Sequence, residues 1–374
     1  MEKKKVLEVM GEGIVHGGEE AFINNLITFI DMDGLTIDWL TPYKCENAFY
    51  ANNLRSKGGT IYEMGLSYTP GKNRWHLIKP INKFFDEHHY DVVHIHSGSI
   101  SALSIVAQAA YKHGVKQIIV HSHLASNGSI KSKAIRLVYS PYLYKYPTNY
   151  MACSIDAANA KFSSLIQKKK KIMIINNGIE LAKYKLDSTI RRKIREEVGI
   201  PIDSRVIGHV GRFSPEKNHE FLINSFSNIY KTNENAYLLL VGDGELHNSI
   251  KQMAKDMQID NRICFAGYVN NIQDYYKAMD LFVLPSLYEG FAIAAVEAQA
   301  TGLPCVFSDR LDAKTTINKN VFTLPVSEND YTLWAEVISK HLYDEPLCDQ
   351  SLMLNQGFDI GETANQIRRI YMEK

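Results

Sequence analysis

The sequence predicts an α/β protein built from two doubly wound domains with parallel sheets. Short apolar runs typical of buried strands alternate with helical patterns almost from end to end, as in repeated βα units. The chain has 374 residues, which is too long for one ordinary core. The strand–helix pattern also restarts near residue 206, after an Asn-Gly turn signal at residues 177–178.

Each expected domain has its own set of strands. In the first we expect strands at residues 5–10, 35–40, 60–63, 91–96, 117–121, 150–152 and 171–175. In the second we expect them at 206–210, 236–241, 262–265, 281–284 and 304–307. Helical periodicity lies between the strands, for example at 19–30, 75–87 and 100–113. The resulting domains are 1–180 and 181–358, and ligands are expected at the carboxyl ends of their strands.

Composition narrows the class of protein. Hydrophobic residues make up 45% and charged residues 22%, as in soluble globular proteins. No apolar run reaches the ~18 residues that span a bilayer, and the first ten residues are too short in apolar content for a signal peptide. The five cysteines show neither metal-ligand spacing nor a disulfide framework. These features predict a cytoplasmic protein.

The net charge of +1 conceals an asymmetry between the two halves. Residues 1–180 hold 21 Lys or Arg and 15 Asp or Glu, and the remaining residues hold 21 and 26. A basic first half is suited to an anionic lipid surface or a phosphorylated acceptor. Ordinary solvated charge, unevenly distributed, is an equally good explanation.

The most informative segment is 284–309, which we interpret as strand, glycine turn, helix and strand. Glu289 stands immediately before Gly290, and Glu297 lies within the expected helix. A helix N-terminus offers unpaired N–H groups to a phosphate. Eight helical residues rise about 12 Å, the scale of a nucleotide-sugar, so the two carboxylates could serve different hydroxyl groups of one ligand.

A second motif follows the strand at 206–210. Its loop carries Arg212 and Lys217 before the next helix. A guanidinium fork and a compact ammonium both suit a diphosphate leaving group. Two incidental cations on an exposed loop would be the alternative if this motif stood alone.

Together these two motifs resemble the donor site of retaining glycosyltransferases with the two-domain GT-B fold, in particular glycosyltransferase family 4. The resemblance implies two Rossmann-like domains facing a central cleft, with a C-terminal helix, 359–374, packing back on the first domain. It implies that Arg212 and Lys217 hold the donor diphosphate, that Glu297 accepts ribose hydroxyls and that Glu289 lies near the transferred sugar. The remaining donor-site residues that it implies are Gly290, Phe291, Ala292 and Ile293, whose amides face phosphate and sugar, and Tyr268 and Val269, whose backbone reads the nucleobase. Ala292 stands where the family more commonly has proline or glycine. The resemblance therefore does not determine which sugar is transferred.

The glycine loop after the first strand resembles the family's loop near donor phosphates and acceptor. Gly17 and Gly18 match it, and His16 beside them is an acceptor-side candidate. The Gly-x-Gly-x-x-Gly spacing is absent, so we do not expect a nicotinamide enzyme.

Two histidine pairs mark strand ends, His94 with His96 and His121 with His123. Alternation places both members of a pair on one face of the sheet. By resemblance, His123 lies near the reacting sugar and acceptor, and His96 belongs to a neighbouring loop wall. Four histidines could form a zinc site. We expect none, because no carboxylate or cysteine completes a typical pattern and the family is metal-independent.

Two further features bear on function. Asp31 and Asp33 form an Asp-x-Asp sequence, which we interpret as turn chemistry because it does not end a buried strand. Residues 129–150 interleave basic and aromatic side chains, as at a membrane interface, although a partly buried helix would show the same composition.

The sequence therefore predicts a retaining, metal-independent glycosyltransferase without a cofactor. Its catalytic residues would be His123, Arg212, Lys217 and Glu289. It would move a hexose or N-acetylhexosamine from a nucleotide-sugar, most simply a UDP-sugar, to a hydroxyl of a glycan or lipid-linked oligosaccharide in exopolysaccharide or capsule synthesis. Peripheral contact with the inner leaflet is expected, and nucleic acid is not. The alternatives are a nucleotide-sugar 2-epimerase of the same fold and a catalytically silent homologue that binds nucleotide-sugar.

Overall fold

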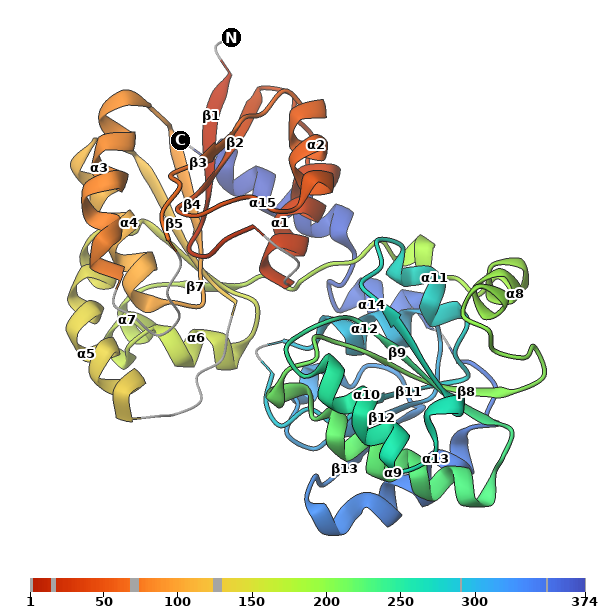
Figure 1. Cartoon of the computed structure of the whole chain (residues 1–374). Helices are drawn as coiled ribbons and strands as arrows, with labels where there is room; N and C mark the ends of the chain where they lie inside the picture. Colours follow the sequence, from red (N-terminus) through yellow and green to blue (C-terminus); the bar gives the residue numbers. More distant parts are fainter. Residues whose placement is uncertain are drawn as a thin grey trace. The chain divides into compact units, whose positions relative to one another are not determined.

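A computed structural model describes residues 3–14, 18–67, 74–123, 130–289, 291–347 and 349–373, with the backbone alone for 130–133. The chain divides into two compact units. Unit 1 comprises Met1–Ile179 together with Gly357–Lys374, and unit 2 comprises Glu180–Gln356. Each unit is a parallel sheet with helices on both faces (Figure 1). The predicted α/β class with two Rossmann-like domains is confirmed.

Unit 1 contains a seven-stranded parallel sheet in the order β3-β2-β1-β4-β5-β6-β7. Its strands are β1 (Lys4–Met10), β2 (Leu35–Thr41), β3 (Ile61–Glu63), β4 (Val92–His96), β5 (Gln117–Ser122), β6 (Asn149–Ala152) and β7 (Ile172–Ile174). The order reverses beside β1, where β2 and β4 flank it. In doubly wound sheets ligands bind at such a switch point, beyond the carboxyl ends of the strands.

Helices cover both faces of this sheet. They are α1 (Gly18–Phe29), α2 (Ala48–Ser56), α3 (Ile78–Glu87), α4 (Ile100–Lys112), α5 (Ile130–Lys145), α6 (Ile155–Lys161), α7 (Ser164–Lys169) and α15 (Ile360–Met372). Helices α3, α4 and α5 lie on one face, and α1, α2 and α15 on the other (Figure 1). The expected helix at 75–87 begins with a 3-10 turn, η1 (Arg74–Leu77).

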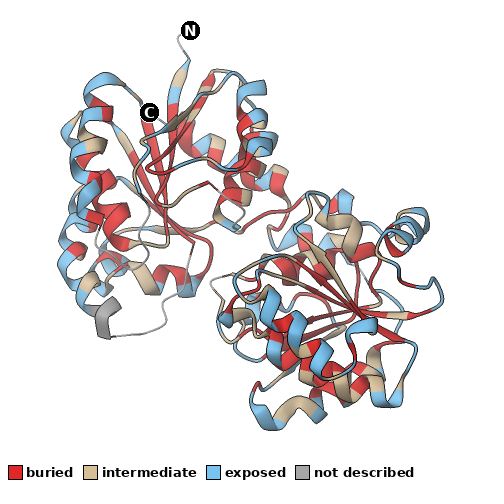
Figure 2. Cartoon of the chain, in the orientation of Figure 1, coloured by how far each residue is buried: buried red, intermediate tan, exposed pale blue. Residues whose placement is uncertain are grey.

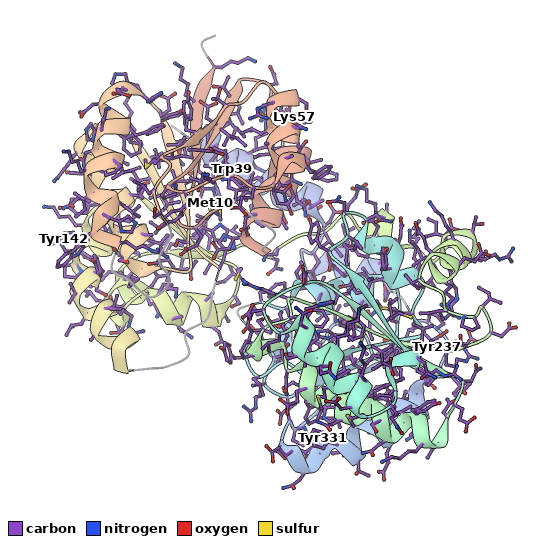
Figure 3. The ribbon with its side chains drawn as sticks, viewed as in Figure 1. Met10, Trp39, Lys57, Tyr142, Tyr237 and Tyr331 are labelled. Atoms are coloured by element: carbon purple, nitrogen blue, oxygen red, sulfur yellow. The ribbon has the colours of Figure 1, made fainter. Side chains whose placement is uncertain are left out.

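The core of unit 1 lies between the sheet and its helices. Met10 and Trp39 point into this interior, whereas Tyr142 and Lys57 lie outside it (Figure 3). The strands are buried and the outer helix faces are exposed (Figure 2). Strands buried on both faces require nearly continuous apolar runs, which is why the sequence pattern located them.

Unit 2 contains a six-stranded parallel sheet in the order β10-β9-β8-β11-β12-β13. Its strands are β8 (Arg205–Val210), β9 (Ala236–Val241), β10 (Ile263–Gly267), β11 (Leu281–Leu284), β12 (Cys305–Ser308) and β13 (Val321–Leu324). The sequence analysis missed β13. This edge strand is only partly buried, although three of its four residues are apolar.

The helices of unit 2 are α8 (Ser188–Glu197), α9 (His219–Thr232), α10 (His247–Asp256), α11 (Ile272–Lys277), α12 (Ile293–Ala300), α13 (Tyr331–His341) and α14 (Gln350–Asn355). Short 3-10 turns complete it: η2 (Leu181–Tyr184), η3 (Pro215–Lys217), η4 (Asp260–Arg262), η5 (Ala313–Thr315) and η6 (Glu328–Asp330). Helices α9, α10 and α13 lie together on one face of the sheet (Figure 1).

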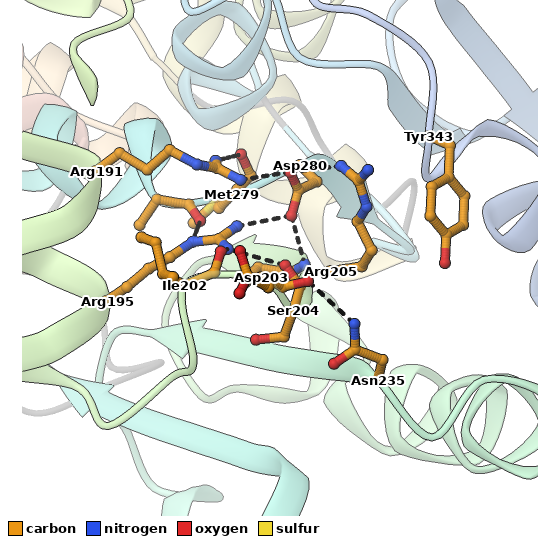
Figure 4. A network of polar contacts seen from close by, with 12 residues as sticks. Arg191, Arg195, Ile202, Asp203, Ser204, Arg205, Asn235, Met279, Asp280 and Tyr343 are labelled. Atoms are coloured by element: carbon orange, nitrogen blue, oxygen red, sulfur yellow. Dashed lines mark hydrogen bonds and ion pairs between the residues drawn. The ribbon is translucent and has the colours of Figure 1, made fainter.

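One ion cluster ties α8 to the sheet. The Asp280 carboxylate accepts from Arg191 at 2.5 Å, from Arg195 at 2.7 Å and from the Val206 amide at 2.7 Å (Figure 4). Arg205 lies at 3.5 Å from the same carboxylate. Asp280 immediately precedes β11, so the cluster is at the amino ends of the strands, opposite the edge where ligands are expected.

Among the helices of the described ranges, none is both long and apolar enough to cross a membrane. The basic and aromatic segment forms α5 and the start of β6. Its exposed side chains include Leu137, Val138, Tyr142 and Tyr144. The Asp31-x-Asp33 sequence is a turn, in which Asp31 accepts from the Asp33 amide and pairs with Arg368 of α15.

Candidate functional site

The loop after β8 carries the two cations that the sequence singled out. Phe213 is fully buried and anchors the loop, while the side chain of Arg212 is 71% exposed and pairs with Glu245 at 3.3 Å. Lys217 ends the 3-10 turn η3, and Asn218 then adopts a left-handed conformation (φ 57°) before α9 begins. Arg212 is therefore held at its backbone while its guanidinium can turn towards a ligand.

Two glycines of the turn after β9 allow this loop to take its place. A Cβ on Gly242 would lie 2.0 Å from the carbonyl oxygen of Gly211, and one on Gly244 would lie 2.6 Å from that of Phe213. Gly242 also has φ of +134°, which favours glycine. The turn at 242–244 thus lets the neighbouring loop pack closely against it.

Lys217 and Glu289 meet at the carboxyl ends of adjacent strands. Strand β8 pairs in parallel with β11, so the loops after them lie side by side. Lys217 Nζ donates to Glu289 Oε1 at 2.5 Å, and Ser286 Oγ donates to the same oxygen at 2.8 Å. The Leu287 amide donates to the Glu216 carbonyl at 2.8 Å. This pair joins the two motifs that the sequence analysis identified separately.

Helix α12 begins later than the spacing argument assumed. It spans Ile293–Ala300, with Ala292 at its N-cap position, so Glu289 lies in the preceding loop and only Glu297 is helical. The expected rise of about 12 Å along eight helical residues was therefore wrong. The amino end of α12 has no side-chain cap within the described residues. The Ile293 amide donates to the Phe291 carbonyl and the Ala295 amide to the Ala292 carbonyl, both at 3.0 Å, so a phosphate would have to replace these contacts at Ile293 and Ala295. Phe291 precedes it, and Gly290 lies outside the described residues.

Glu297 holds two tyrosines from other elements. Its Oε1 accepts from Tyr184 at 2.6 Å and its Oε2 from Tyr276 at 2.9 Å. Desolvation raises the pKa of Glu297, and these two hydrogen bonds act in the opposite direction. Each carboxylate oxygen has a second lone pair, so Glu297 can still accept ligand hydroxyls. The tyrosines fix where those lone pairs point.

The family resemblance implies that Glu297 accepts ribose hydroxyls of a nucleotide-sugar. On that expectation, Glu297→Gln should raise the KM for the donor about ten-fold while kcat stays within about two-fold, because charge-assisted hydrogen bonds would be lost. The amide can still pair with both phenols, so the melting temperature should change little. Initial-rate kinetics on the purified variant would check this. An unchanged KM would remove Glu297 from the donor site.

The predicted nucleobase segment lies just after β10. Gly267 has φ of +68°, which turns the chain, and Tyr268 is 45% exposed. Val269 is half-buried. The turn presents backbone groups at the same edge of the sheet as the loops after β8 and β9, because all these strands are parallel.

On unit 1, the expected glycine loop is described only from Gly18, the first residue of α1. His16 and Gly17 lie outside the described residues. Glu19, which the sequence analysis did not single out, has both carboxylate oxygens buried. Desolvation, together with the charges of Glu20 and Glu12, raises its pKa to about 8.

This buried carboxyl predicts a pH dependence of stability. The pKa of Glu19 rises from 4.5 in the unfolded chain to about 8 in the fold, so the folded state binds the extra proton between these values. Stability is therefore fully present below pH 4.5 and is lost as the pH rises towards 8. At pH 8.5 Glu19→Gln should melt at least about 3 °C above wild type, with no such gain at pH 5. Calorimetry at both pH values checks this, and equal melting temperatures would contradict it.

The four histidines of the strand-end pairs form one buried cluster in unit 1. His96 ends β4 and is fully buried, so its expected place in a loop wall was wrong. His123 directly follows β5 and is 5% exposed. His96 Nδ1 lies 2.9 Å from His123 Nε2, and Phe22 of α1 packs against both rings.

A carboxylate does belong to this cluster, contrary to the sequence analysis. Glu8 of β1 is fully buried, with Oε2 2.8 Å from His96 Nε2. His94, His96 and His121 each offer a nitrogen within 4.8 Å of the others, which is close enough for a shared metal ion. In the structure both nitrogens of His94 and of His96 face hydrogen-bond partners, so an ion would have to displace these contacts.

Comparison with known proteins gives unit 2 a family. Residues 190–351 match the family Glycosyl transferases group 1. This chain carries a glycosyl transferases group 1 domain. The match spans the loops after β8, β10 and β11 and all of α12, so Arg212, Lys217, Glu289 and Glu297 lie inside it.

Relatives with assigned names agree with this family. EpsF of Bacillus subtilis strain 168, which carries the name of a glycosyltransferase, is 29% identical over 345 residues, or 90% of this chain and 88% of EpsF. A galactosyltransferase of Escherichia coli, named for transfer from UDP-Gal to α-D-GlcNAc-diphosphoundecaprenol, is 29% identical over 78% of this chain and 77% of its own. The capsular polysaccharide biosynthesis glycosyltransferase CapM of Staphylococcus aureus is 30% identical over 54% and 53%.

Solved structures share the fold over nearly the whole chain. The crystal structure of Anabaena HepE in complex with UDP and glucose superposes with a TM-score of 0.79 at 20% identity, covering 99% of this chain and all of that one. These similarities establish the GT-B fold. With the family match, the relatives support glycosyltransferase activity in polysaccharide biosynthesis.

Proposed function

We propose that this chain is a retaining glycosyltransferase of family 4 that moves a hexose or N-acetylhexosamine from a UDP-sugar to a hydroxyl of a glycan or lipid-linked acceptor. The observation that carries the proposal is the meeting of Lys217 and Glu289 at the carboxyl ends of β8 and β11, inside the region that matches the family. An ammonium, a carboxylate and a helix N-terminus then face the same edge of the sheet.

The choice of donor and acceptor rests on named relatives. The E. coli relative is named for a UDP-sugar donor and a diphosphoundecaprenol-linked acceptor, and HepE was crystallised with UDP and glucose. CapM is named for capsular polysaccharide biosynthesis. A UDP-sugar donor and a lipid-linked glycan acceptor are therefore the substrates that we propose here.

The chemistry that these residues support is positioning and charge stabilisation. Lys217, Arg212 and the amides at the amino end of α12 would bind the diphosphate and stabilise the charge that grows as it departs. Glu297 would accept the ribose hydroxyls, and Glu289, held by Lys217 and Ser286, would lie near the transferred sugar. The departing diphosphate oxygen would itself take the proton of the acceptor hydroxyl on the same face of the sugar, which retains the anomeric configuration.

The test is incubation of the purified protein with separate UDP-, GDP- and ADP-sugars in the presence of EDTA, followed by mass spectrometry. Slow hydrolysis of one UDP-sugar, without acceptor, supports a metal-independent transferase and identifies its donor. An isomerised nucleotide-sugar would instead indicate a 2-epimerase. Tight binding without turnover, even after a lipid-linked acceptor is added, would indicate a silent homologue.

We also propose that α5 contacts the inner leaflet of the membrane. Arg136 and Lys145 on this helix accompany the exposed Leu137, Val138 and Tyr142, a combination suited to an anionic lipid surface. Replacing Lys131, Lys133 and Arg136 by serine should weaken sedimentation with vesicles that contain phosphatidylglycerol. Unchanged sedimentation would remove this contact from the proposal.

A further inference from the structure

Unit 1 contains a buried network of six polar side chains within its apolar core. It connects β1, β4, the end of β5 and α15. Its members are Glu8, His94, His96, His121, His123 and Tyr371. All are at most 5% exposed. In such an interior each donor needs an acceptor.

Glu8 is the point at which two chains of hydrogen bonds meet. The first chain runs from Glu8 Oε2 to His96 Nε2 at 2.8 Å, and from His96 Nδ1 to His123 Nε2 at 2.9 Å. It ends at His123 Nδ1, a buried nitrogen with no hydrogen-bond partner in the part of the chain that the structure describes.

The second chain has the same form. Tyr371 Oη donates to Glu8 Oε1 at 2.5 Å, and His94 Nδ1 lies 2.6 Å from the same hydroxyl. His94 Nε2 then lies 3.2 Å from His121 Nδ1. This chain ends at His121 Nε2, which also lacks a partner within the described ranges.

The histidines of both chains are neutral. Burial lowers the pKa of His96 to about 3 and lowers the pKa of His94, His121 and His123 well below the ordinary value of 6.5. A neutral imidazole has one N–H donor and one acceptor nitrogen. Along each chain of hydrogen bonds, every ring donates at one nitrogen and accepts at the other. The group at the Glu8 end of the chain therefore determines which nitrogen of each ring carries the proton.

Glu8 sets these proton positions. Its Oε1 accepts from the Tyr371 hydroxyl, and its Oε2 lies 2.8 Å from His96 Nε2 and 3.4 Å from His94 Nδ1. Burial raises the pKa of Glu8, while the charge of His94 and the hydrogen bond from Tyr371 lower it. In its ionised form the carboxylate only accepts. His96 then carries its proton on Nε2 and accepts at Nδ1, and His123 carries its proton on Nε2. This assignment leaves His123 Nδ1 as a bare acceptor.

We propose that Glu8 is a positioning residue that acts through His96 to fix the tautomer of His123, so that His123 Nδ1 accepts a hydroxyl of the sugar or acceptor. The use of that nitrogen rests on the proposed function, but the tautomer itself does not. The second chain carries the matching assignment, with the proton of His121 on Nδ1 and a bare Nε2. Glu8 thus orients His123 indirectly, through the imidazole ring of His96, which lies between them.

The test is long-range proton–nitrogen NMR on the full chain with ¹⁵N-labelled histidine, which reports the tautomer of each ring. We expect His123 with its proton on Nε2 and His121 with its proton on Nδ1. Single His123→Gln and His121→Gln variants assign the signals. The opposite tautomer at His123 would overturn the proposal, as would stoichiometric zinc in the purified protein with metal-bound histidine signals.

Glu8→Gln then tests the cause. Tyr371 holds the amide oxygen on its own side, so the amide nitrogen replaces Oε2 and donates to His96. The tautomers of His96 and His123 should then both change, with the proton of His123 moving to Nδ1. We expect kcat to fall about ten-fold while the donor KM stays within two-fold. Tyr371→Phe keeps the Glu8–His96–His123 chain and is the matched control, with its His123 tautomer unchanged.

A wild-type tautomer of His123 in Glu8→Gln would overturn the role of Glu8. The NMR result is independent of turnover. If the protein proves to have no transferase activity, the tautomer assignment can still be correct. If the tautomers are wrong, the transferase can still be active, so the two proposals fail separately.

Discussion

Replacing Lys217 by alanine is expected to lower kcat for sugar transfer by about 10²–10³-fold while the protein stays folded. Its ammonium lies beyond the carboxyl end of β8 and contacts Glu289 in the loop before α12, where we propose that the departing diphosphate binds. The side chains of Lys217 and Glu289 are 19% and 12% exposed, so the pair lies in a partly desolvated place where charges act strongly. Single-turnover measurements with the UDP-sugar identified in the donor panel would check this.

A second variant separates two explanations for that loss. Lys217→Ala also leaves Glu289 without its cation, and a free carboxylate could repel the diphosphate by itself. If Lys217 only neutralised Glu289, then Lys217→Ala combined with Glu289→Gln would recover most of the rate. If Lys217 stabilises the leaving group, the double variant stays slow. Lys231→Ala, an exposed lysine on α9 that bonds only to Asn228 among the described contacts, is the matched control. A rate within three-fold of wild type for Lys217→Ala would contradict the assignment.

Much of the fold follows from the sequence because the sheets are parallel and buried on both faces. Such strands are continuous apolar runs, and β1, β8, β9 and β11 lie within a residue of their predicted positions. The last helix, α15, also agrees with its predicted range. Edge strand β13 was missed although Val321, Phe322 and Leu324 make it mostly apolar, and its four residues are too few for a distinct pattern.

The candidate site was predictable where it depends on the ends of strands. Loops after neighbouring parallel strands must meet, so Arg212, Lys217 and Glu289 could be expected at one edge before any coordinates. The start of α12 was not predictable, since Ala292 and Ile293 give no cap signal. Tyr184 is 113 residues away from its partner Glu297, and no local pattern connects them.

Glu8 could have been identified from the sequence, because it is a carboxylate within an otherwise apolar strand. A carboxylate in the middle of an apolar strand is costly unless it is paired. Parallel register places Glu8 opposite His94. The two histidine pairs at the ends of β4 and β5 had already been identified from the sequence. The order of the strands, β1-β4-β5, is what brings the carboxylate to them, and that order is a property of the assembled sheet.

Replacing Asp280 by asparagine is expected to lower the free energy of unfolding of unit 2 by about 3–5 kcal/mol. The side chain of Arg195 is fully buried, and its guanidinium donates to Asp280 and to the carbonyls of Ala278, Ile202 and Ser204. Burial lowers the pKa of Arg195 while the charge of Asp280 raises it. An asparagine would leave this buried cation, and the partly buried Arg191, without a counter-charge (Figure 4).

The measurement is urea unfolding followed by the fluorescence of Trp334, which is fully buried in unit 2, in a background where Trp39 and Trp75 are replaced by phenylalanine. Arg205→Gln is the matched control. Arg205 is 39% exposed and 3.5 Å from Asp280, so its loss should cost less than about 1 kcal/mol. A loss below 1 kcal/mol for Asp280→Asn would show that the cluster tolerates an unpaired arginine. The kcat of folded Asp280→Asn should be close to wild type, because Asp280 immediately precedes β11, at the end of the strand opposite Glu289.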